Sequence, residues 1–80
     1  MATKAFVLIE TAVGKSRDVV KALKSTSGVV SVDLVTGPYD IIALVEAADL
    51  GSIGDMVTQQ VHTIGGIQRT VTCLAVGQQS

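Results

Sequence analysis

Two segments of this chain, residues 4–11 (KAFVLIET) and 40–47 (DIIALVEA), carry apolar side chains at most positions. Successive side chains of a β-strand point to opposite faces, so Phe6 and Leu8 lie on one face of the first segment while Val7 lies on the other. A strand that is apolar on both faces is typical of the interior of a layered fold. Any fold of this chain must therefore bury both faces of two strands.

The segments between the strands carry helical signals. Ser16 is placed to cap a first helix that Gly28 ends, and Asp49 is placed to cap a second helix. Gly65 and Gly66 end the second helix. Its apolar residues recur every three or four positions, which predicts one buried stripe: Leu50, Ile53, Val57, Val61 and Ile64.

Two more strands complete the pattern. Residues 29–36 (VVSVDLVT) alternate between apolar and polar positions, with Val30 and Val32 on one face, and this alternation favours an edge strand. Residues 67–76 (IQRTVTCLAV) form the last strand. The order β-α-β-β-α-β with right-handed crossovers predicts an α+β, ferredoxin-like fold, in which a four-stranded antiparallel sheet has both helices on one face.

The predicted fold leaves one face of the sheet uncovered. Two helices cover a single side, yet two strands are apolar on both sides, and soluble monomers rarely expose so large an apolar patch. The chain is 48% hydrophobic and 16% charged, and its single cysteine cannot form an internal disulfide that would support a small core. We therefore predict a homodimer that packs sheet against sheet, a dimeric α+β barrel. We expect one domain over residues 1–80 with an ordered core at 4–76.

The composition excludes several classes of function. Cys73 is predicted to be a small core residue in a reducing cytoplasm. His62 is the sole histidine, and no His, Cys, Asp and Glu cluster has metal-ligand spacing, so neither a metal nor another cofactor is predicted.

No apolar run approaches the ~20 residues of a membrane helix, and no signal peptide is recognisable, so we expect a cytoplasmic protein without a membrane partner. The four basic residues between positions 15 and 24 are typical of a solvated helix face and do not indicate direct nucleic-acid binding.

The connection between the second and third strands, residues 35–41 (VTGPYDI), contains the only proline and the only tyrosine of the chain. Gly37 and Pro38 predict a hairpin turn, and such a turn does not need the aromatic ring of Tyr39. Tyr39 either covers the end of the sheet or contacts a ligand or a neighbouring subunit. We hypothesise that the amides of this turn bind a carboxylate and that Asp40 or a carbonyl binds the ammonium group of a small zwitterion.

Two further polar residues have two readings each. His62 lies at the end of the second helix, away from the apolar stripe, and is either a solvated helix-end histidine or a ligand contact. Arg69 is either one partner of a salt bridge at the end of the sheet or a clamp for a carboxylate, which guanidinium groups bind bidentately. No pair of acids and no G-x-S-x-G or P-loop motif indicates catalysis, so an enzyme is not predicted.

The residues also resemble a known family. A T-G-x-Y-D segment followed by an apolar strand, and an I-x-x-T-x-T segment after the second helix, resemble the effector-binding module of the Lrp/AsnC transcription regulators, the RAM (regulation of amino-acid metabolism) domain. The resemblance covers residues 4–76. The residues that carry it include Val29, Val32, Val35, Thr36, Gly37, Pro38, Tyr39, Asp40, Val61, Ile64, Gly66, Ile67, Thr70 and Thr72.

The resemblance implies an assembly and a binding site. In the family, dimers of this module assemble into octamers or related rings, and amino acids bind between dimers. Full-length members carry a helix-turn-helix domain, and this chain resembles a stand-alone form that senses an amino acid and modulates a full-length paralogue through mixed oligomers. Carried onto this sequence, the ligand-binding residues are Leu34, Thr36, Gly37, Pro38, Tyr39, Asp40, His62 and Thr63.

Two alternative functions remain open. Dimeric α+β barrels include small cofactor-free enzymes, whose pockets are usually lined by His, Tyr, Asn or Trp, and this sequence has one His, one Tyr and neither Asn nor Trp. A regulatory subunit of the ACT type shares the same order of strands and helices. A cavity inside one subunit would favour the enzyme, whereas a pocket between dimers would favour the sensor.

Overall fold

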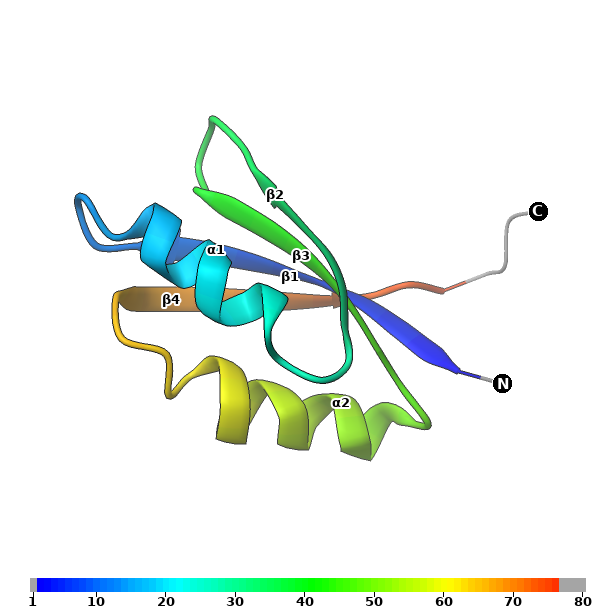
Figure 1. Cartoon of the computed structure of the whole chain (residues 1–80). Helices are drawn as coiled ribbons and strands as arrows, with labels where there is room; N and C mark the ends of the chain where they lie inside the picture. The colour runs from blue at the N-terminus through cyan, green and yellow to red at the C-terminus, as the bar shows by residue number, and fades with distance from the viewer. Residues whose placement is uncertain (1, 77–80) are drawn as a thin grey trace.

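The structure, a computed structural model, describes residues 2–76. Its elements follow one another in the predicted order (Figure 1). They are β1 (Thr3–Thr11), α1 (Ser16–Lys24), β2 (Val29–Leu34), β3 (Ile41–Ala47), α2 (Leu50–Met56), η1 (Val57–Val61) and β4 (Ile67–Leu74), where η1 is a π-helical continuation of α2.

The four strands form one antiparallel sheet in the order β2-β3-β1-β4. Strands β1 and β3, the two segments that are apolar on both faces, occupy its centre. Helices α1 and α2 lie together on one side of the sheet (Figure 1). The predicted ferredoxin-like fold is confirmed.

The core fills the space between the sheet and the helices. Alternate residues of β1 and β3, such as Ile9 and Val45, are fully buried, and they pack against Leu23 of α1 and Ile53 of α2. The predicted stripe of the second helix is therefore the buried one over most of its length, although Leu50 at its start is 58% exposed. Among residues 2–76, the buried apolar residues are Ala5, Val7, Ile9, Val19, Leu23, Ile41, Ala43, Val45, Ile53, Met56, Val57 and Val61.

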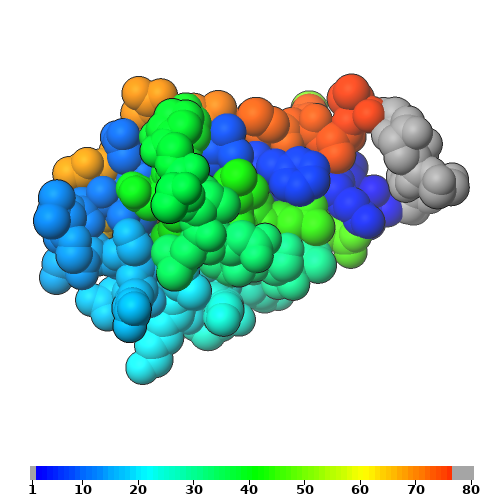
Figure 2. Space-filling model, turned by 90° about the horizontal axis from the view of Figure 1, so that it is seen from above, coloured from blue at the N-terminus to red at the C-terminus, as the bar shows by residue number. Residues whose placement is uncertain are grey.

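The other face of the sheet, which we call the open face, is apolar at its centre. Seen from above, atoms of β1, β3 and β4 lie at the surface and little of the second helix is visible (Figure 2). Phe6, which is 43% exposed, lies opposite Leu44 on β3 and Cys73 on β4. The prediction that Cys73 belongs to the core of the chain is wrong, since its side chain is exposed on this face. The open face comprises Phe6, Leu8, Ile42, Leu44, Val71 and Cys73.

A β-bulge changes the faces of β2. Val29 pairs with Val45 and Ser31 pairs with Leu44, so Val30 is an extra residue on the β2 side. Val29 and Val32 pack against the core, whereas Val30 is 57% exposed. The prediction that Val30 shares a face with Val32 is wrong, because strict alternation ignores the inserted residue.

The helix termini differ in how they are capped. Lys15 occupies the N-cap position of α1 without a side-chain hydrogen bond, and the predicted cap, Ser16, lies instead with its Oγ 2.8 Å from Oγ1 of Thr11. Helix α1 also ends at Lys24, well before Gly28, whose φ of 92° belongs to the turn into β2. The second cap is confirmed, since Oδ1 of Asp49 accepts a hydrogen bond of 2.8 Å from the backbone N–H of Ser52.

The Asp49 cap predicts a pH dependence of stability. The backbone N–H and the hydroxyl of Ser52 hold the pKa of the Asp49 carboxyl below its ordinary value. A carboxyl whose pKa is lower in the folded state stabilises the protein above its unfolded pKa, and this contribution disappears as the pH falls through the folded pKa. We expect Asp49→Ala to cause a small decrease in Tm at neutral pH and to flatten the loss of Tm on acidification. Asp49→Asn keeps an acceptor without a charge, so thermal unfolding should show a neutral-pH Tm closer to the wild type.

Candidate functional site

Three connections meet at one end of the sheet, which we call the loop end. They are the turn after β1, the loop between β2 and β3, and the turn before β4 (Figure 1). The backbone N–H of Ala12 donates to the carbonyl of Gly66 at 2.8 Å, which ties the first connection to the third. The predicted ligand-binding residues all lie at or beside this end.

Asp40 fastens the β2–β3 loop to β1. Its Oδ2 accepts hydrogen bonds from the backbone N–H of Thr11 at 2.8 Å and from the Thr11 hydroxyl at 3.3 Å. Its own N–H donates to the carbonyl of Ile9 at 2.9 Å, and its carbonyl accepts from the N–H of Val35. The Asp40 amide is therefore occupied within the chain, and any ammonium group bound by its carboxylate would share that carboxylate with Thr11.

Tyr39 reaches from the same loop to β4. Its hydroxyl accepts a hydrogen bond of 3.1 Å from Nη2 of Arg69, and the guanidinium carbon lies 5.8 Å from the centroid of the tyrosine ring. A cation at this distance from an aromatic face is attracted by the ring. The sequence singled out each residue separately, but their contact depends on strand register, which pairs Arg69 with Glu10 beside the loop.

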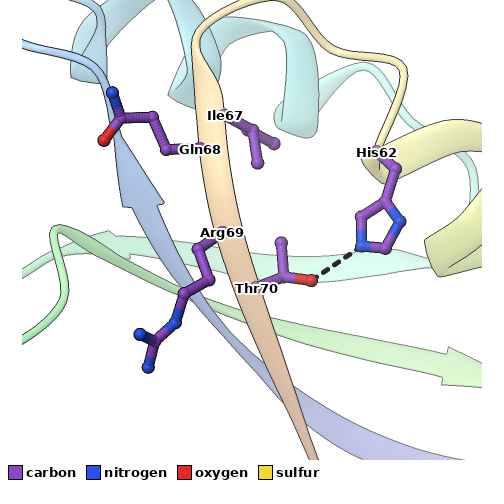
Figure 3. Close-up of a pocket in the computed structure, with 5 residues that line it drawn as sticks. All are labelled: His62, Ile67, Gln68, Arg69 and Thr70. Carbon is purple, nitrogen blue, oxygen red and sulfur yellow. Dashed lines mark hydrogen bonds between the residues drawn. The ribbon is translucent and has the colours of Figure 1, made fainter.

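His62 and Thr70 form a second polar pair. Nε2 of His62 lies 2.7 Å from Oγ1 of Thr70, and the two residues line a surface hollow of 260 Å³ with Ile67, Gln68 and Arg69 (Figure 3). The side chain of Arg69 extends from β4 on the side away from His62. The two polar pairs therefore lie on either side of the first residues of β4.

The second helix ends in the π-helical turn η1, and His62 is its C-cap residue. The N–H of His62 donates to the carbonyl of Val57, five residues earlier, at 2.9 Å. Thr63, another predicted site residue, donates its hydroxyl to the carbonyls of Gln59 and Gln60. Its side chain thus closes the helix end, and His62 is the residue of this turn that reaches the hollow.

The eight predicted site residues separate into two groups within one chain. Those of the loop, from Leu34 to Asp40, lie on the segment that carries Tyr39 to its contact with Arg69, and Leu34 is 56% exposed. Across residues 2–76 no side-chain hydrogen bond joins this group to His62 or Thr63. Thr11, the hydrogen-bond partner of Asp40, and Thr70, the partner of His62, were not predicted as site residues. Thr70 belongs to the I-x-x-T-x-T segment, which was the sequence signal that could have indicated it.

A second hollow, of 320 Å³, lies at the opposite end of the sheet, beside α2. It is lined by none of the predicted site residues, and its charged side chains are Glu46 and Asp55. Within the described part of the chain, no three His, Cys, Asp or Glu side chains come together as metal ligands would. None of the helices there is long and apolar enough to cross a membrane.

Comparison with known proteins identifies the family. The model of the Lrp/AsnC ligand binding domain matches residues 4–79. This chain belongs to the Lrp/AsnC family. An uncharacterised HTH-type transcriptional regulator, PF0250 of Pyrococcus furiosus, is 31% identical to this Lrp/AsnC domain over 78 residues. The match covers 94% of the chain and 52% of the relative, so the chain spans about half the length of this curated relative.

Solved structures share the fold of this chain. The protein TTHA0845 from Thermus thermophilus is 36% identical to the Lrp/AsnC domain, covers 98% of both chains and superposes with a TM-score of 0.92. The transcriptional regulator NMB0573 of Neisseria meningitidis, solved as a complex with L-Met, is 15% identical and has a TM-score of 0.87 over 98% of this chain and 52% of that one. At that identity, the likeness to NMB0573 shows the fold alone.

Proposed function

We propose that this domain senses an amino acid or a related small metabolite at a boundary between copies of the chain. One observation carries the proposal: the predicted site residues form two separate groups at the loop end, and the hollow that His62 lines there is open to solvent and not an enclosed cavity. Small-molecule sites usually bury most of the ligand surface. A second copy at the loop end would supply the missing walls, and the membership in a family of ligand-binding domains supports binding rather than catalysis.

The proposed assembly starts from the open face. Its central residues, such as Phe6 and Leu44, are apolar and lie side by side on adjacent strands. A second copy would remove this patch from water, and the gain is about 25 cal/mol for each Å² of apolar surface buried. We propose a dimer packed sheet to sheet and a ring of such dimers, an octamer or a similar assembly, which brings loop ends together.

The proposed mechanism is a population shift. An effector changes the assembly only if it binds one assembly state more tightly than the others. The HTH-type regulator of Pyrococcus furiosus is about twice as long as the matched region, which supports a full-length regulator as the partner. NMB0573 was solved with an amino acid, which supports an amino acid as the effector. The regulated partner that we propose is a full-length Lrp/AsnC regulator, which this domain would join in mixed oligomers.

A screen of the twenty amino acids by thermal shift, with native mass spectrometry of each sample, tests the proposal. A bound effector at 100 times its Kd stabilises the folded state by about 2.7 kcal/mol. We expect one or a few amino acids to raise the Tm and to change the distribution of oligomers. Twenty amino acids that change neither the Tm nor the oligomer masses would overturn the sensing function.

His62→Ala is expected to weaken the response. Loss of one polar contact to a ligand costs about 1.5 kcal/mol, or roughly tenfold in Kd. The measurement is a thermal-shift titration with the amino acid that stabilises the wild type most. Thr58→Ala, on the same π-helical turn but outside both hollows, is the matched control and should respond like the wild type. Equal responses of His62→Ala and the wild type would remove His62 from the site.

A further inference from the structure

We infer that Arg69 binds the carboxylate of the effector and that Tyr39 holds the guanidinium group in place. The inference rests on the proposed sensing function and specifies its ligand chemistry: a small molecule with a free carboxylate. It also moves carboxylate recognition from the turn amides to a side chain of β4, because two of those turn positions are unsuited. Pro38 has no N–H, and the N–H of Asp40 donates to Ile9.

The salt-bridge reading of Arg69 does not match its contacts. Glu10 is its cross-strand neighbour in the β1–β4 register, yet the guanidinium group is turned towards Tyr39. The one ion pair formed among residues 2–76 joins Lys4 to Glu46, at 3.9 Å. Arg69 is thus a cation whose observed contacts within the chain are a neutral hydroxyl and an aromatic ring.

The contacts of Arg69 leave N–H donors of its guanidinium group available to bind an anion. A guanidinium group has five N–H donors in a rigid plane, and a carboxylate accepts two of them side by side. The phenolic oxygen of Tyr39 accepts from Nη2, and the ring lies against the same group. These two contacts limit the rotamers of an otherwise exposed side chain, which lowers the entropy cost of binding.

The position of Arg69 places the carboxylate at the rim of the open face. Arg69 is on the same face of β4 as Val71, and its side chain extends away from the His62–Thr70 pair (Figure 3). In the sheet-to-sheet dimer that we propose, the contact with the second copy would begin at this rim. A carboxylate at Arg69 would therefore lie at the subunit boundary, where assembly and binding are coupled.

The acid and amide forms of one amino acid test the inference directly. The twenty free amino acids are screened first, and the tightest-binding one is then compared with its primary amide, which lacks the negative charge. We expect the wild type to bind the acid at least about tenfold more tightly than the amide. Arg69→Gln should lose about tenfold in affinity for the acid and should no longer distinguish acid from amide.

The control uses the only other arginine. Arg17 is exposed on α1 and lines neither hollow, and Arg17→Gln makes the same change of charge. It should keep both the affinity and the preference for the acid. Tyr39→Phe keeps the ring but removes the hydroxyl, and should reduce the preference for the acid in the wild-type background but not in Arg69→Gln, as expected of a positioning residue.

The outcomes separate the inference from the sensing function. A preference for the acid that survives in Arg69→Gln overturns the role of Arg69 and leaves sensing intact. If Arg69→Gln instead lowers the oligomer mass without amino acid and keeps that preference, Arg69 pairs with an acid of a second copy, and the inference is wrong. If none of the twenty amino acids binds, the sensing function fails and the inference fails with it.

Discussion

Phe6→Glu is expected to dissociate the proposed sheet-to-sheet dimer into monomers that keep their fold. Phe6 lies on the central strand β1 at the middle of the open face, with Leu44 and Cys73 on either side. In a sheet-to-sheet dimer, glutamate at this position would bury an unpaired charge. Loss of an aromatic residue at the centre of an interface costs about 2 kcal/mol or more, which is roughly 30-fold in Kd.

The measurement is sedimentation velocity at micromolar concentration, together with circular dichroism. Phe6 does not belong to the core between the sheet and the helices, so the circular dichroism spectrum of the monomer should match that of the wild type. Leu50→Glu is the matched control, because Leu50 is more exposed than Phe6, at 58% against 43%, but lies at the start of α2. An acid is favourable at a helix N-terminus, so this variant should assemble normally. Dissociation by both variants, or by neither, would contradict a dimer built on the open face.

Gly66→Ala is expected to be strongly destabilising. Gly66 has a φ of 100°, a conformation that L-residues rarely adopt. A Cβ there would also lie 2.9 Å from Cβ of Lys15 and 3.2 Å from Cγ2 of the buried Val19. Backbone strain costs about 1–3 kcal/mol and overpacking adds about 1–3 kcal/mol, so we expect a loss of roughly 2–6 kcal/mol.

The neighbouring glycine provides the control for this substitution. Gly65 has no positive φ, and a Cβ built there meets no atom within 4 Å. Gly65→Ala should therefore change the free energy of unfolding by less than about 1 kcal/mol. Urea unfolding of both variants at one protein concentration is the measurement, because the proposed assembly would make stability depend on protein concentration. Similar stabilities of the two variants would show that the Gly66 turn relaxes at little cost.

Much of the fold could be predicted because its signals are local. The apolar runs that predicted β1 and β3 as strands, the apolar stripe of the second helix and the Asp49 cap each depend on residues close in sequence, and each of these elements is confirmed. Two of the errors share a cause. The bulge at Val30 and the exposure of Cys73 depend on what lies across the sheet, which alternation within one strand does not report.

The candidate site was predicted less completely than the fold. The sequence indicated Tyr39 by its rarity and His62 by its place at a helix end, but it did not pair Tyr39 with Arg69 or His62 with Thr70. The contacts of Tyr39 with Arg69 and of His62 with Thr70 join residues 30 and eight positions apart. Such pairs form only after β4 has docked against β1 in one register.

The sequence by itself determined the order of the elements, the two strands that need cover on both faces, and the surplus of apolar surface that two helices cannot bury. These properties follow from the spacing of apolar residues and from the total amount of apolar surface, and both can be read from the sequence. Only the tertiary structure decided how the polar residues are used. Asp40 ties the loop to Thr11, whereas Arg69 is held by the neutral Tyr39. The physical reason is that hydrogen bonds act over about 3 Å, so their partners are chosen by strand register and not by sequence spacing.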